Sequence, residues 1–141
     1  MNEVKFNSQI CTTKEQSQHL LDLGLKPETA DMEIEICKTD YSITGYVSKG
    51  CLESEISEGL VELIPAWSLH RLIELLPQDI HLDNYTDTYY YFTIDPFKVI
   101  YTNSLRSWIY QKDEGCLYDK LVNTIEWTIK NNFFNKEYLK Q

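Results

Sequence analysis

The sequence lacks any cluster of positive charge. Among its 141 residues, 13 are Lys or Arg and 22 are Asp or Glu, which gives a formal net charge of −9, and no two basic residues are adjacent. A nucleic-acid backbone or an anionic membrane surface attracts Lys and Arg side chains that are grouped together. We therefore expect neither direct nucleic-acid binding nor attachment to a membrane.

The cysteines also lack a recognisable pattern. Cys11, Cys37, Cys51 and Cys116 form no C-x-x-C pair, and no paired-histidine motif accompanies them, so the sequence indicates neither a zinc finger nor a redox dithiol. An even number of cysteines is compatible with two disulfides. The N-terminal residues, however, lack the apolar run and cleavage site of a secretory signal. We therefore expect free thiols in a cytoplasmic protein.

Long apolar runs and glycine-rich loops are absent as well. A membrane-spanning helix needs about 20 consecutive apolar residues, and because no stretch approaches this length, we predict no membrane span. The five glycines are far apart and form no phosphate-binding loop, so nucleotide binding is not indicated. We expect no cofactor.

The composition that remains is that of an ordinary globular protein. Hydrophobic residues make up 43% of the chain and charged residues 25%, and the three Trp, ten Tyr and five Phe argue against disorder. The length is sufficient for one hydrophobic core without metal or disulfide support. We predict a single globular domain over residues 1–141, with fraying at residues 1–10 and 134–141.

Two helices are indicated near the ends of the chain. Thr13 and Gln16 match a capping box for a helix that runs to Leu23, and Gly24 supplies its C-terminal stop. A last helix is expected to start near residues 113–115 and to run to about residue 130. Its apolar stripe consists of Tyr118, Leu121, Val122, Ile125 and Ile129.

A third helix is indicated by the segment IPAWSLHRLIELLP, in which Ser68 is the expected N-terminal cap. Its apolar residues recur at helical spacing and form one buried stripe: Leu69, Leu72, Ile73 and Leu76. The polar residues His70, Arg71 and Glu74 fall outside this stripe. We interpret them as a solvent-exposed face, because their spacing does not require a catalytic role.

The strand signals complete an α+β pattern. Residues 32–37 alternate between apolar and acidic side chains, as in a half-buried strand, and further strands are expected at residues 42–47 and 60–64. Residues 79–111 contain aromatic and β-branched runs separated by turns, which predicts an antiparallel meander. The fold class that follows is α+β, with a mostly antiparallel sheet (a β-meander) and about three helices packed on one face.

Three segments resemble, in content and order, a known family. LLDLGLKPETADM, IPAWSLHRLIELLP and DKLVNTIEWTIKNNF, with a short aromatic meander before the last, are similar to a family of small uncharacterised proteins encoded by gut Bacteroidetes and their prophages or other mobile elements. The resemblance covers most of the chain and implies a mobile-element setting. Because the family has no established activity, the resemblance assigns no catalytic residue.

One stretch has the spacing of metal ligands. In DIHLDNYTD, the side chains of Asp79, His81 and Asp83 would share one face of an extended strand. Carboxylate and imidazole groups are suitable ligands for a divalent metal ion. The alternative is an ordinary solvated face of an edge strand, which has the same alternation.

Exposed aromatic residues are the clearest candidates for partner binding. In TYYYF, Tyr89 and Tyr91 take one face of a strand, and helices are expected to cover the other face. Together with Trp108, they are our interaction candidates, because such side chains combine a large contact area with a hydrogen-bonding tip. The N-terminal segment or a second subunit would cover the same face in the alternative arrangement.

Three functional hypotheses follow. The leading one is a non-enzymatic accessory protein of a mobile element, whose partner is another protein or a second copy of itself. The second is an inhibitor whose acidic surface imitates nucleic acid, which a net charge of −9 permits. The third is a metal-assisted enzyme that uses Asp79, His81 and Asp83.

Overall fold

The structure is a computed structural model that describes residues 8–49, 59–82 and 88–141. Its helices and strands are α1 (Lys14–Asp22), η1 (Pro27–Thr29), β1 (Met32–Cys37), β2 (Ile43–Ser48), β3 (Val61–Ala66), α3 (Leu69–Leu75), β4 (Asp79–His81), β5 (Tyr89–Ile94), β6 (Val99–Thr102), β7 (Trp108–Lys112), α4 (Leu117–Lys130) and η2 (Lys136–Tyr138). This content confirms the predicted α+β class. Within the described ranges, no helix has both the length and the apolar character needed to cross a bilayer.

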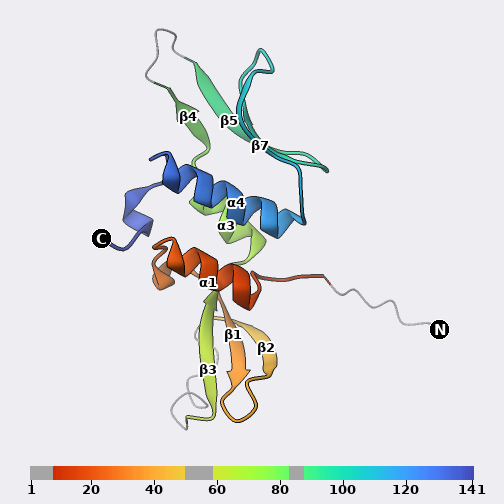
Figure 1. The fold of residues 1–141 in the computed structure, drawn as a ribbon, viewed down its shortest axis with the longest axis vertical. Helices are drawn as coiled ribbons and strands as arrows, with labels where there is room; N and C mark the ends of the chain where they lie inside the picture. Colours follow the sequence, from red (N-terminus) through yellow and green to blue (C-terminus); the bar gives the residue numbers. More distant parts are fainter. Residues whose placement is uncertain (1–7, 50–58, 83–87) are drawn as a thin grey trace, which may run out of the picture.

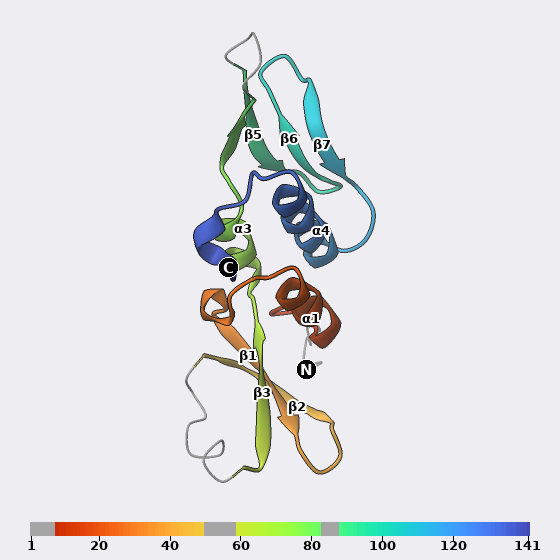
Figure 2. The same cartoon turned by 60° about the vertical axis from the view of Figure 1, so that its left-hand side comes forward.

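Two antiparallel sheets lie at opposite ends of an elongated molecule, and the helices lie between them (Figures 1 and 2). The first sheet has three strands in the order β2-β1-β3, and the second has four strands in the order β4-β5-β6-β7. The second sheet is the predicted meander. The strands divide into two sheets because α3 separates β3 from β4 and fills the space between them with apolar side chains.

The ends of α1 are set by local interactions that the sequence predicts. Thr13 Oγ1 accepts a hydrogen bond from Gln16 N at 3.1 Å, and Gln16 Oε1 accepts one from Thr13 N at 2.9 Å, which completes the capping box. At the other end, Gly24 has a φ of 99°, and Leu25 N donates to Leu20 O at 3.1 Å. Leu20 and Leu25 are both fully buried, as expected for this type of helix stop.

The polar face of α3 differs in part from the prediction. His70 and Glu74 lie in solvent, with side chains 83% and 49% exposed and a contact of 2.7 Å between Nε2 and Oε1. Arg71 is only partly exposed: its side chain is 33% exposed, and its Nη1 donates to Thr29 O at 3.0 Å. Its Nε lies 4.0 Å from Glu74 Oε1 and is buried without a hydrogen-bond partner among the described residues. Arg71 therefore lies outside the apolar stripe, as predicted, but it is only partly in solvent, because its guanidinium group contacts η1.

The main core is formed by the helices and the inner face of the four-stranded sheet. Its buried members include Leu20, Leu25, Trp67, Leu72, Leu75, Leu76, Val99, Tyr118, Leu121, Ile125 and Phe134. Trp67 is completely buried, and its Nε1 donates to Thr29 Oγ1 at 2.9 Å, so its polar atom is satisfied. A smaller cluster on the three-stranded sheet contains Cys11, Ile34, Ile36 and Ala66.

The C-terminal residues 134–141 are not frayed. The side chain of Phe134 is only 4% exposed and packs against the ring of Tyr138, with 5.9 Å between the ring centroids. Lys140 N donates to Gly24 O at 2.7 Å, which ties the end of the chain to the stop of α1. This short segment therefore has its own apolar anchor and a backbone partner far away in the sequence.

Candidate functional site

The inner face of the four-stranded sheet is covered by α4. Phe92, Tyr101 and Tyr110 lie directly opposite one another on β5, β6 and β7 and therefore share this face. The ring of Trp127 on α4 lies 4.6 Å from the Tyr110 ring and 5.9 Å from the Tyr101 ring, between centroids. Burial raises the pKa of Tyr101, so its hydroxyl remains a neutral donor, here to Pro77 O at 2.8 Å. This face is structural.

The outer face of the same sheet carries a row of four residues, one from each strand. Asp79 lies opposite Tyr91, Tyr91 opposite Thr102, and Thr102 opposite Trp108. Tyr91 is 52% exposed and Trp108 is 57% exposed. We call Asp79, Tyr91, Thr102 and Trp108 the outer row, and it places two large aromatic side chains and one carboxylate side by side on the surface.

Tyr89 extends this surface along β5. It lies opposite His81, its ring stacks on the His81 imidazole with 4.6 Å between the centroids, and it is 44% exposed. The structure thus places Tyr89, Tyr91 and Trp108 on one exposed face. The described part of the N-terminal segment does not cover this face, because Thr12 N donates instead to Trp67 O at 2.9 Å.

Regular alternation along β7 does not predict the face on which Trp108 lies. Trp108 and Tyr110 are two residues apart, and in a regular strand they would share the covered face. A register shift next to Thr102 places Trp108 opposite Thr102, whereas Tyr110 lies opposite Tyr101. The only signal in the sequence is the adjacent turn, in which Asn103 Oδ1 accepts hydrogen bonds from Leu105 N and Ser107 N.

The metal-site hypothesis involves the same face. Asp79 and His81 occupy alternate positions of β4, as predicted, and Asp83 lies outside the described residues. Over residues 8–49, 59–82 and 88–141, no group of three His, Cys, Asp or Glu side chains is placed to hold a metal ion. The observed neighbour of the His81 ring is the aromatic ring of Tyr89.

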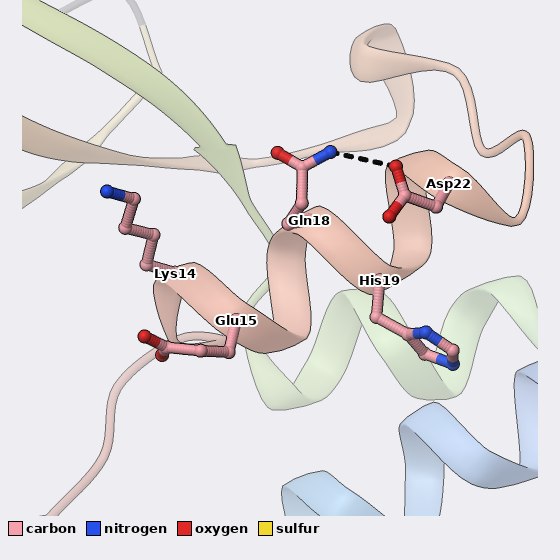
Figure 3. A pocket seen from close by; sticks show the side chains of 5 residues that line it. All are labelled: Lys14, Glu15, Gln18, His19 and Asp22. Atoms are coloured by element: carbon pink, nitrogen blue, oxygen red, sulfur yellow. Dashed lines mark hydrogen bonds between the residues drawn. The ribbon is translucent and has the colours of Figure 1, made fainter.

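Another group of polar side chains lines a shallow depression on α1. Figure 3 shows its lining residues, Lys14, Glu15, Gln18, His19 and Asp22. Gln18 Nε2 donates to Asp22 Oδ1 at 2.9 Å, and His19 Nε2 lies 3.2 Å from Glu126 Oε2 on α4. Lys14 and Glu15 point away from His19 (Figure 3), so these groups do not converge on one substrate position.

The described cysteines are free thiols in three different environments: Cys11 is buried, Cys37 is half-buried and Cys116 is exposed. Burial and, to a smaller extent, the nearby Asp31 raise the pKa of Cys11 to about 11. Cys51 lies outside the described residues. Because the thiolate is the reactive form, Cys11 is expected to be inert in the folded protein.

This difference can be measured with iodoacetamide and peptide mass spectrometry. We expect Cys116 to be alkylated in the native protein and Cys11 to be alkylated only after unfolding in urea. The raised pKa of Cys11 also makes the stability of the folded protein depend on pH. Between the ordinary thiol pKa of 9.0 and about 11, the unfolded chain releases the Cys11 proton and the folded protein keeps it, so the free energy of unfolding falls as pH rises through this range. Equal labelling rates for the two thiols in the native protein would contradict this assignment.

The acidic side chains are distributed over the whole described molecule. They occur on both sheets and on the helices, for example at Glu15, Asp22, Glu33, Glu35, Glu62, Glu74, Asp79, Asp119, Glu126 and Glu137. A nucleic-acid mimic needs its carboxylates in an array along one face. The described acids do not favour that arrangement.

The chemical groups of the outer row are suited to non-covalent contact with a partner. The outer row combines exposed aromatic area with one carboxylate and one hydroxyl, and its described members include no nucleophile paired with a base. Comparison of the chain with protein-family models, with curated proteins and with solved structures finds no match.

Proposed function

We propose that this protein is a non-enzymatic accessory factor, in a mobile-element setting, that binds a partner protein through the outer face of its four-stranded sheet. The observation that carries the proposal is the outer row, in which Tyr91 and Trp108 are each more than half exposed. The opposite face of the sheet packs on α4, where Tyr101 is fully buried and Phe92 and Tyr110 are partly buried. Because α4 packs against its other face, the sheet is rigid, and its outer side chains lose little conformational entropy on binding.

The residue types of the outer face are those that dominate protein interfaces. Tyr and Trp are enriched among residues whose truncation costs most binding free energy, because they bury large areas and have few rotatable bonds. Tyr89 and His81 continue the same surface as a stacked pair. Water released from these rings on binding provides the driving force.

The charge of the chain supports a basic partner. The net charge is −9, and Asp79 contributes a carboxylate at one end of the outer row. An Arg side chain of the partner can stack on the ring of Tyr91 and reach the Asp79 carboxylate on the adjacent strand from the same position. The partner class that fits is therefore a protein with an exposed, Arg-containing segment.

A peptide selection tests this proposal. We would select a random-peptide display library against the wild-type protein and measure the selected peptides by isothermal titration calorimetry. The expected peptides contain Arg, and Trp108→Ala and Tyr91→Ala are each expected to weaken their binding by about tenfold or more. Their affinity is also expected to fall with increasing salt, because part of the attraction is electrostatic.

The matched control is Phe97→Ala. Phe97 is an aromatic residue of the same sheet, 77% exposed, but it lies in the β5–β6 turn and outside the outer row. This variant is expected to bind like the wild type. If Tyr91→Ala and Trp108→Ala also bind like the wild type, the outer row is not the binding surface and the proposal is wrong.

A further inference from the structure

The strand β2 differs from the other edge strands of the molecule. The sheets have the orders β2-β1-β3 and β4-β5-β6-β7, so β2, β3, β4 and β7 are edges. Exposed edges are usually protected from pairing by charges, by proline or by short length. β3 contains Glu62 and Pro65, β4 has three residues and begins with Asp79, and β7 ends with Lys112. β2, with the sequence ITGYVS, has neither a charge nor a proline over six residues.

An apolar patch lies beside this edge. The register of β2 on β1 shifts next to Glu35, so that Ile43 lies opposite Ile36 and Tyr46 lies opposite Ile34. Ile43 and Tyr46 therefore share the face that carries the buried Ile34 and Ile36, yet they are 46% and 42% exposed. Ile10 is 52% exposed and lines the same depression as Tyr46. We call Ile10, Ile43 and Tyr46 the β2 patch.

We propose that two copies of this chain associate through β2, which pairs antiparallel with β2 of the second copy. The two three-stranded sheets then form one continuous sheet across the contact. A two-fold axis perpendicular to the sheet keeps equivalent faces on the same side. The β2 patches of both copies consequently adjoin on one face of this sheet.

The absence of charge along β2 permits a second copy as the partner. Two chains of net charge −9 repel each other wherever their carboxylates meet. Residues Tyr41–Ser48 contain no charged side chain, so two copies can approach along β2 without placing like charges opposite each other. Among the described residues, no strand pairs with the outer edge of β2, so its backbone groups can pair with those of the same edge in a second copy.

This contact is independent of the proposed binding face. The three-stranded sheet and the four-stranded sheet lie at opposite ends of the molecule, with β2 at one edge of its sheet and β3 at the other edge (Figure 1). A dimer formed through β2 leaves both outer rows accessible. The two proposals can therefore fail separately.

Sedimentation velocity over a concentration series tests the dimer. The wild type is expected to sediment as a dimer, and Ile43→Lys as a monomer, because each copy would place a charged ammonium group within an otherwise uncharged contact. Ile94→Lys is the matched control: Ile94 is 36% exposed at the end of β5, in the other sheet, and this variant is expected to remain dimeric. Trp108→Lys is also expected to remain dimeric.

Hydrogen exchange of the wild type provides a test that needs no substitution. The amides of Gly45–Val47 are expected to become more protected as the protein concentration rises, whereas those of β7 are not. A wild type that is monomeric throughout the series would overturn the proposal. So would a dimer that Trp108→Lys dissociates and Ile43→Lys does not.

Discussion

Leu72→Ala is expected to lower the free energy of unfolding by about 2 to 5 kcal/mol, a large part of the stability of a typical domain. Leu72 is completely buried on α3 and belongs to the main core with Leu121 and Ile125 of α4. Removal of its branched side chain loses the free energy of burial and leaves a cavity that the packed helices cannot fill. Chemical denaturation in urea, followed by circular dichroism, measures this change.

Two neighbouring residues of α3 provide graded controls. His70→Ala is expected to cost no more than about 0.5 kcal/mol, because the His70 side chain is 83% exposed and contacts only a surface carboxylate, that of Glu74. Arg71→Ala is expected to cost about 1 kcal/mol, because it removes the hydrogen bond from Nη1 to Thr29 O. A loss for His70→Ala as large as that for Leu72→Ala would show that the exposed face of α3 is assigned incorrectly.

Features that depend on neighbouring residues were predictable from the sequence. The capping box of Thr13 and Gln16 and the helix stop at Gly24 occur where expected, because each interaction joins residues that are close in the chain. The β1 strand also has its predicted bounds, since its alternation matches the two faces of a sheet.

Features that depend on distant residues were not predictable in the same way. Arg71 has the spacing of a surface residue, but its partner, Thr29, lies 42 positions away. The division of the strands into two sheets likewise depends on where α3 packs, which helical periodicity alone does not specify.

The candidate site shows the same division. The alternation of TYYYF was sufficient to place Tyr89 and Tyr91 together on β5. The position of Trp108 depends on a register shift between β6 and β7, and such shifts follow from turn geometry and strand pairing rather than from composition. The outer row is therefore a property of the folded sheet.

Phe134→Ala is the second substitution with a large expected effect, about 3 to 5 kcal/mol in the free energy of unfolding. Phe134 is 4% exposed and belongs to the main core, and its backbone N donates to Thr128 O at 3.2 Å. It is the apolar anchor of residues 134–141, which return to the stop of α1 through Lys140 N and Gly24 O. Loss of the anchor removes both its own burial and the support of this segment.

Phe97→Ala is the control for this experiment, because it makes the same chemical change at a side chain that is 77% exposed. Its expected cost is no more than about 0.5 kcal/mol. Urea denaturation of the two variants, with hydrogen exchange at Leu139 and Lys140, separates a docked C-terminal segment from a frayed one. If the segment is docked, these two amides exchange faster in Phe134→Ala than in the wild type, and Phe134→Ala loses much more stability than Phe97→Ala. If the segment is frayed, both variants lose little stability, and by similar amounts.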